Sequence, residues 1–184
     1  MIVLELFLFC LLFTAVVKIF VPHNAIEGLF FYPASVQERV IAMGKANRAQ
    51  IERRRKAFKL TISLVVAVSL VLMIGAWNGV RDFKTAYLQT LLSLEVMNVY
   101  DALVIDKLWV GHSRFWMIPG TEDLPFAKSW SYLWKEWTKY AIVWVFGAAV
   151  AAGLVVLFFK EKQKWNITIS ESLASWTGTE LKSC

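Results

Sequence analysis

LQTLLSLEVMNVYDALVIDKLWVG, residues 88–111, is apolar enough to cross a membrane but has more polar side chains than a spanning helix usually carries. The polar residues that need an explanation are Glu95, Asn98, Tyr100, Asp101 and Asp106. Ionisable groups are costly to bury in a membrane, so each of these carboxyls is expected to have a partner or a function. On either side of this segment the chain alternates between apolar blocks and basic or aromatic stretches.

The composition of the chain indicates an integral membrane protein. Hydrophobic residues make up 58% of its 184 residues and charged residues 18%, against about 45–50% and about 25% in soluble domains. The excess lies in blocks of the length that a helix needs to cross the hydrocarbon core. Several of the nine tryptophans lie at the edges of these blocks, as is typical of interfacial anchors. We therefore predict an all-α membrane protein.

The apolar blocks predict a single four-helix transmembrane domain, residues 1–160, followed by a polar tail, residues 161–184. The spans are expected at about residues 1–20, 60–77, 88–110 and 140–159. The first block lacks a basic N-terminal region and a small-residue cleavage site, so we interpret it as a retained helix rather than a signal peptide. The short connector between the second and third spans makes them antiparallel neighbours.

Amphipathic helices are predicted before the second and fourth spans. The first begins near Ser35, with Val36, Val40 and Met43 at helical spacing, and is expected to continue into the second span with a bend at Gly44. The other follows a turn-rich loop, GHSRFWMIPGTEDLP, and lies at the interface. Its aromatic stripe consists of Trp130, Trp134, Trp137 and Tyr140.

The distribution of the 20 Lys and Arg residues predicts the orientation. Most of them lie in residues 18–59 and 107–139, two segments that four spans place on the same side of the membrane. The positive-inside rule then puts both long loops in the cytoplasm and both termini outside. A prokaryotic plasma membrane is favoured, and its anionic headgroups explain the net charge of +6 without a nucleic-acid partner.

An assembly larger than one chain is also expected. Four short helices are too few to enclose a pathway for a transported species within one chain, so we predict a homo-oligomer or a larger membrane complex. The small residues of the last span, Gly147 to Gly153, provide a surface for close helix packing in such an assembly.

The third span presents two sets of candidate ligand-binding residues. On an ideal helix Glu95, Asn98 and Asp106 share one broad face, whereas Asp101 points about 140° away from Asp106. The two aspartates are therefore not expected to converge unless the helix breaks. Glu95 is either a proton or cation site or a structural carboxyl that fastens helices together. Asp101 and Asp106 either form a site or pair with nearby basic residues.

The predicted topology brings basic and histidine side chains to the acidic end of the third span. His112 follows that span, and Arg53, Arg54 and Arg55 precede the second. The arginines would contact lipid headgroups or, alternatively, a phosphate-bearing substrate. His23 joins the same layer, but neither HExxH nor HxxxH spacing occurs, so no metal site is predicted and no cofactor is indicated.

Part of this region resembles known sequences. The runs NVYDALVIDKLW, residues 98–109, and IPGTE, residues 118–122, are similar to segments of small uncharacterised bacterial integral membrane proteins. The resemblance implies a prokaryotic plasma membrane and carries over no activity and no site residue.

Three functions remain open from the sequence. The leading one is a non-enzymatic module that binds a cation or charged small molecule at the acidic third helix, as a transporter, channel subunit or accessory. The second is an intramembrane enzyme acting on a lipid or isoprenoid substrate, with catalytic residues unknown. The third is a structural or regulatory protein in which every charge is paired. A glycine-rich phosphate loop, a GxSxG elbow and a CxxC pair are all absent from the sequence.

Overall fold

A computed structural model describes residues 2–124 and 129–177, and within them the chain is helical, with no strand. Among these residues four helices are long and apolar enough to cross a membrane. They occupy Ile2–Phe20, Arg48–Trp77, Phe83–Val110 and Trp130–Phe159. The predicted all-α fold with four potential membrane-spanning helices is therefore confirmed.

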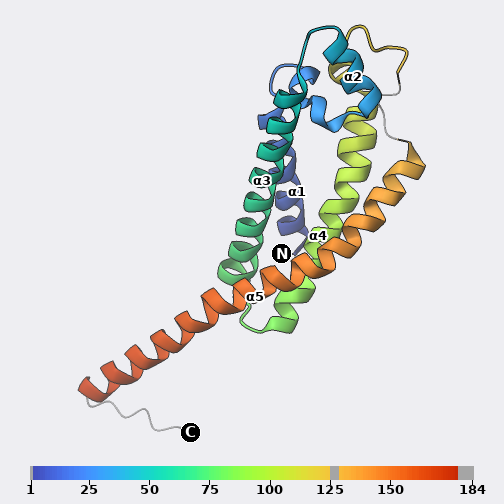
Figure 1. Cartoon of the computed structure of the whole chain (residues 1–184). Helices are drawn as coiled ribbons and strands as arrows, with labels where there is room; N and C mark the ends of the chain where they lie inside the picture. The colour runs from blue at the N-terminus through green and yellow to red at the C-terminus, as the bar shows by residue number, and fades with distance from the viewer. Residues whose placement is uncertain (1, 125–128, 178–184) are drawn as a thin grey trace.

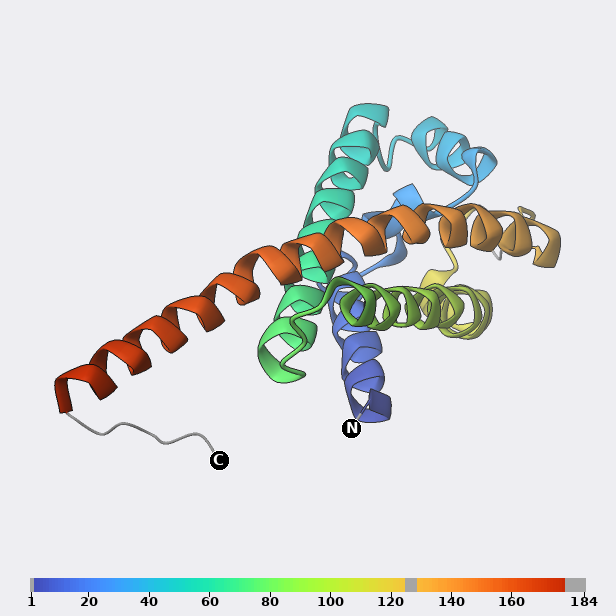
Figure 2. The same ribbon diagram turned by 90° about the horizontal axis from the view of Figure 1, so that it is seen from below.

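The four long helices form one bundle. α1 (Ile2–Phe20), α3 (Arg48–Val71) and α4 (Phe83–Tyr100) run alternately up and down, and α5 (Trp130–Thr177) crosses α4 obliquely (Figures 1 and 2). Ala148 and Ala152, which belong to the small-residue surface of the last span, are inaccessible in the core of this bundle. These two alanines therefore pack within the chain rather than facing another copy.

A break separates the amphipathic helix before the second span from that span. α2 (Ala34–Ala42) ends at a turn in which Gly44 has a positive φ of 69°, a conformation that favours glycine. α3 then starts afresh, because the side chain of Asn47 accepts a hydrogen bond from the Gln50 N–H at 2.8 Å. The prediction of one continuous helix bending at Gly44 is therefore wrong.

Both helices of the central hairpin end in π-helical turns. η2 (Leu72–Trp77) continues α3, and η3 (Asp101–Val110) continues α4. π-Helical segments are rare and are often found at functional sites.

The start of α4 is set by Asp82, whose side chain accepts a hydrogen bond from the Thr85 N–H at 2.8 Å. This hydrogen bond holds the pKa of the Asp82 carboxyl below its usual value.

The two long loops pack together at one end of the bundle and form a folded unit, which we call the cap (residues 21–47 and 111–124). It contains η1 (Ala25–Phe31), α2 and η4 (Arg114–Trp116) around a core of its own. Trp116 is fully buried at its centre, and the Tyr32 hydroxyl donates a 2.6 Å hydrogen bond to the Trp116 carbonyl. The two loops that four spans place on one side thus contact each other directly.

α5 is one uninterrupted helix of 48 residues, Trp130–Thr177. The predicted aromatic helix and the fourth span are its first part, and in Figure 1 its second part extends away from the bundle. The predicted polar tail therefore continues the helix as far as Thr177, whereas its last residues, 178–184, lie outside the described part of the chain.

Candidate membrane-embedded site

Glu95 lies midway along the α4–η3 rod, which spans Phe83–Val110. At about 1.5 Å per residue it is roughly 18 Å from the start of this rod, far from either membrane surface. Its side chain is half-buried, and among the side chains that the structure describes it makes no hydrogen bond or ion pair. A carboxyl without a partner at this depth is costly, and such residues commonly mark binding sites.

Asn98 connects the same side of α4 to α5. Its amide nitrogen donates a hydrogen bond to the carbonyl of Trp137 at 3.2 Å, and its side chain is 8% exposed. Glu95 precedes Asn98 by three residues, so it lies on the same side of α4, one turn earlier. Because α5 runs antiparallel to α4 (Figure 1), the turn after Trp137 in α5 lies near the level of Glu95.

The inner face of α5 presents aromatic and small residues at this level. Trp137, Ala141 and Trp144 recur at helical spacing on the partly buried face, followed by the buried Ala148. The indole nitrogens of Trp137 and Trp144 are shielded, and neither has a hydrogen-bond partner in the described part of the chain. The seam between α4 and α5 therefore holds an unpartnered carboxyl and two unpartnered N–H donors, with the small Ala141 between the indoles.

Asp101 and Asp106 are the first and sixth residues of η3, and both are half-buried. In a π-helix the backbone hydrogen bond joins residues five apart, so these two aspartates come to the same side of the helix. The expectation that they point in different directions held for a straight α-helix only, and this segment is π-helical. Each aspartate takes part in an interaction within the described chain.

The arginines before the second span do not act as a group. Arg54 donates hydrogen bonds to the carbonyls of Phe20 at 3.4 Å and Glu27 at 2.9 Å. Arg55 bonds to Glu52 and, at 3.3 Å, to Gln37. Both side chains thus fasten the cap to α3, and only Arg53 is exposed without a bond in the described region.

The two histidines are both exposed, and each has its own partner. His23 contacts the carboxylate of Glu27 at 3.5 Å, with its side chain 80% exposed. The Nδ1 atom of His112 is 2.7 Å from the carbonyl of Lys107. Within the described residues no group of three His, Cys, Asp or Glu side chains lies together.

A polar cluster at the opposite end of the bundle was not predicted. The amide nitrogen of Asn78 donates to Glu5 at 2.9 Å and to Gln89 at 3.2 Å, so it joins the start of α1 to the hairpin between α3 and α4. Glu5 is buried, with 8% exposure. The sequence could have predicted this cluster, because the predicted spans place these three residues at the same membrane boundary.

Comparison of the chain with known proteins identified no relative. No protein-family model, curated protein or solved structure matches the chain.

Proposed function

We propose that this chain binds a small organic ammonium ion at the seam between α4 and α5, as a transporter or as the accessory subunit of one. The observation that carries the proposal is Glu95, a half-buried carboxyl in the middle of a spanning helix with no partner among the described side chains. A bound cation would offset the cost of burying this group.

The aromatic residues of α5 favour an organic cation as the ligand. Ring faces attract ammonium groups, and the attraction strengthens when both are removed from water. Trp137 and Trp144 lie on the inner face of α5, at the levels on either side of Glu95. A divalent metal would instead need several oxygen ligands, and within the described residues no group of three His, Cys, Asp or Glu side chains lies together around Glu95.

The expected setting is a prokaryotic plasma membrane, with the cap in the cytoplasm and both termini outside. The positive-inside rule supports this orientation, because the basic residues in the first part of α3 lie at the cap end of the bundle. A ligand at Glu95 would then lie near the middle of the bilayer. Access from either side could come through movement of α5 against α4.

Ligand titration of the purified protein in nanodiscs tests the proposal. Tetramethylammonium and methylammonium chloride are added, with sodium chloride at equal ionic strength as the control, and tryptophan fluorescence is recorded. We expect a saturable change with one ammonium ion that weakens at least tenfold in Glu95→Gln, a loss of about 1.4 kcal/mol. Glu38→Gln, which changes an exposed carboxyl in the cap, is expected to behave like the wild type.

Two results would refute this function. One is an identical response of Glu95→Gln and the wild type, and the other is an equal response to sodium. Uptake of labelled methylammonium into proteoliposomes then separates the two roles. A transporter carries the ion across the membrane without another protein, whereas an accessory subunit binds the ion but does not transport it.

A further inference from the structure

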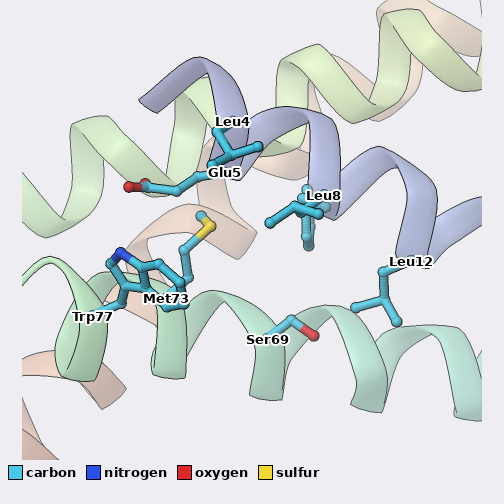
Figure 3. A pocket seen from close by; sticks show the side chains of 8 residues that line it. Leu4, Glu5, Leu8, Leu12, Ser69, Met73 and Trp77 are labelled. Carbon is cyan, nitrogen blue, oxygen red and sulfur yellow. The ribbon is translucent and has the colours of Figure 1, made fainter. Parts of the chain in front are cut away.

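A cavity of about 200 Å³ lies between α1 and the helix formed by α3 and η2 (Figure 3). Its walls are almost entirely apolar, and several of its leucines are also exposed on the outside of the bundle. Because α1 and α3 are both candidate spanning helices, the medium outside this cavity would be lipid hydrocarbon. The lining residues used below are Leu4, Glu5, Leu8, Leu12, Ser69 and Trp77.

The cavity is a groove that runs along the helices. On α1 it extends from Leu4 to Leu12, and on the antiparallel helix from Trp77 back to Ser69. These stretches correspond to roughly 10–12 Å at 1.5 Å per residue. Since Glu5 is near the start of α1, one end of the groove lies at the membrane boundary and the other points toward the bilayer centre.

The boundary end of the groove carries its polar groups. In Figure 3 the carboxyl of Glu5 and the indole of Trp77 lie at the same end, away from Leu12. Glu5 is more than nine-tenths buried, and its Oε2 atom accepts the hydrogen bond from Asn78. No bond to its Oε1 atom is found within the described residues, and this oxygen is not enclosed by the protein, so an acceptor held in place through Oε2 remains accessible to a ligand.

We propose that this groove binds one chain of an amphiphile with a protonated amino headgroup. The aliphatic chain fills the apolar part between α1 and α3. The ammonium group meets the carboxyl of Glu5 and the face of the Trp77 ring, the two features that attract a cation at this depth. The site is at the opposite end of the bundle from the cap and does not depend on the ammonium site at Glu95.

Photolabelling of the full chain in phosphatidylcholine nanodiscs tests the proposal. The probe is a long-chain alkylamine with a diazirine in its chain, and cross-linked peptides are mapped by mass spectrometry. We expect labels in residues 4–12 and 69–77. Unlabelled dodecylamine should compete for these positions, and dodecanoate should not.

Two variants examine the two halves of the ligand. Leu8→Trp fills the groove and is expected to lower labelling at least fivefold, whereas Leu11→Trp, on an exposed part of α1 that does not line the groove, should leave it unchanged. Glu5→Gln keeps an acceptor for Asn78 but removes the charge. It is expected to lower labelling by the amine about tenfold while labelling by an uncharged diazirine alkane of the same length stays constant.

The proposal is overturned if labels spread evenly over the exposed helix faces, or if Leu8→Trp and Leu11→Trp are labelled alike. It is also overturned if the alkane labels the wild-type groove as strongly as the amine. A normal labelling pattern in Glu5→Gln would show that the carboxyl does not recognise the headgroup and would refute the assigned ligand.

Discussion

The cap and the helix bundle use their polar side chains in opposite ways. In the cap, long charged side chains bond to the backbone of distant segments: Lys45 to the carbonyl of Pro119 at 3.0 Å, and Arg39 to that of Gly120 at 3.4 Å. In the bundle, Thr90 and Ser93 bond to carbonyls of their own helix, and Glu95 bonds to nothing in the described region. These charged side chains therefore hold the cap together, whereas the charged Glu95 of the bundle is left without a partner in the described region.

The surrounding medium accounts for this difference. The cap gathers apolar residues into a core, which water favours strongly. Lipid gives no such advantage to helix association, so the bundle depends on close packing and a few interhelical hydrogen bonds. Thr14 and Tyr100, whose oxygens are 2.9 Å apart, join α1 to α4 in this way.

The largest expected effect is the loss of Trp116 from the cap. Trp116→Ala should lower the free energy of unfolding of the cap by about 3–5 kcal/mol, the usual range for removing a buried large aromatic ring. Limited trypsin digestion in nanodiscs measures this, because Arg39 and Lys45 become cleavable when the cap opens. Trp134→Ala, at a 61% exposed position, is the control, and equal digestion of both variants would contradict a cap that folds around Trp116.

A smaller effect of the opposite sign is expected in the bundle. Glu95→Leu should raise the stability of the bundle by up to about 2.5 kcal/mol, because it removes an ionisable group from the middle of a span. Loss of helical circular dichroism during titration with sodium dodecyl sulfate measures the change. Glu38→Leu in the cap should be close to neutral. Destabilisation by Glu95→Leu would mean that this carboxyl fastens helices together, as in the structural alternative.

The smallest effect concerns the hydroxyl of Tyr32. Tyr32→Phe removes its hydrogen bond to Trp116 and should destabilise the cap by about 1 kcal/mol near neutral pH. Burial raises the pKa of Tyr32 above its ordinary value of 10.0, so the folded cap binds this proton more tightly than the unfolded chain does. The wild-type cap therefore keeps this contribution below pH 10 and loses it as the pH rises further.

Urea titrations of the cap at pH 8 and pH 11, followed by tryptophan fluorescence, measure this dependence. The difference between the wild type and Tyr32→Phe should shrink or reverse at the higher pH. A difference that stays constant would show that the hydroxyl is not shielded in the folded cap.

The sequence predicted the spans but not how the residues between and along them are arranged. Apolar blocks are a strong signal, and the four helices follow from them. The break at Gly44 was interpreted as a bend because nothing in the flanking residues opposes a helix, whereas the packing of α2 in the cap requires the chain to turn there. The role of Trp116 was equally hidden, since it lies in a turn-rich loop whose core forms only when residues far apart meet.

The candidate site was predicted in part, for a related reason. Glu95 and Asn98 follow from the helical spacing of polar residues in an apolar span. The shared side of Asp101 and Asp106 depends on the π-helical turns of η3, which no residue pattern in this segment reveals. The partners on α5 depend on how two helices cross, and this is set by packing rather than by local sequence.

The continuity of α5 has a mechanical consequence. A straight helix of 48 residues is about 72 Å long, more than twice the thickness of the hydrocarbon core. Its second part would therefore act as a lever if α5 tilted at its crossing with α4. A change in tilt of about 10° at that crossing would move the far end by several ångströms, since the arm beyond the core residue Ala152 is roughly 38 Å long. Small adjustments of the seam around Glu95 would thus be converted into large displacements outside the bundle.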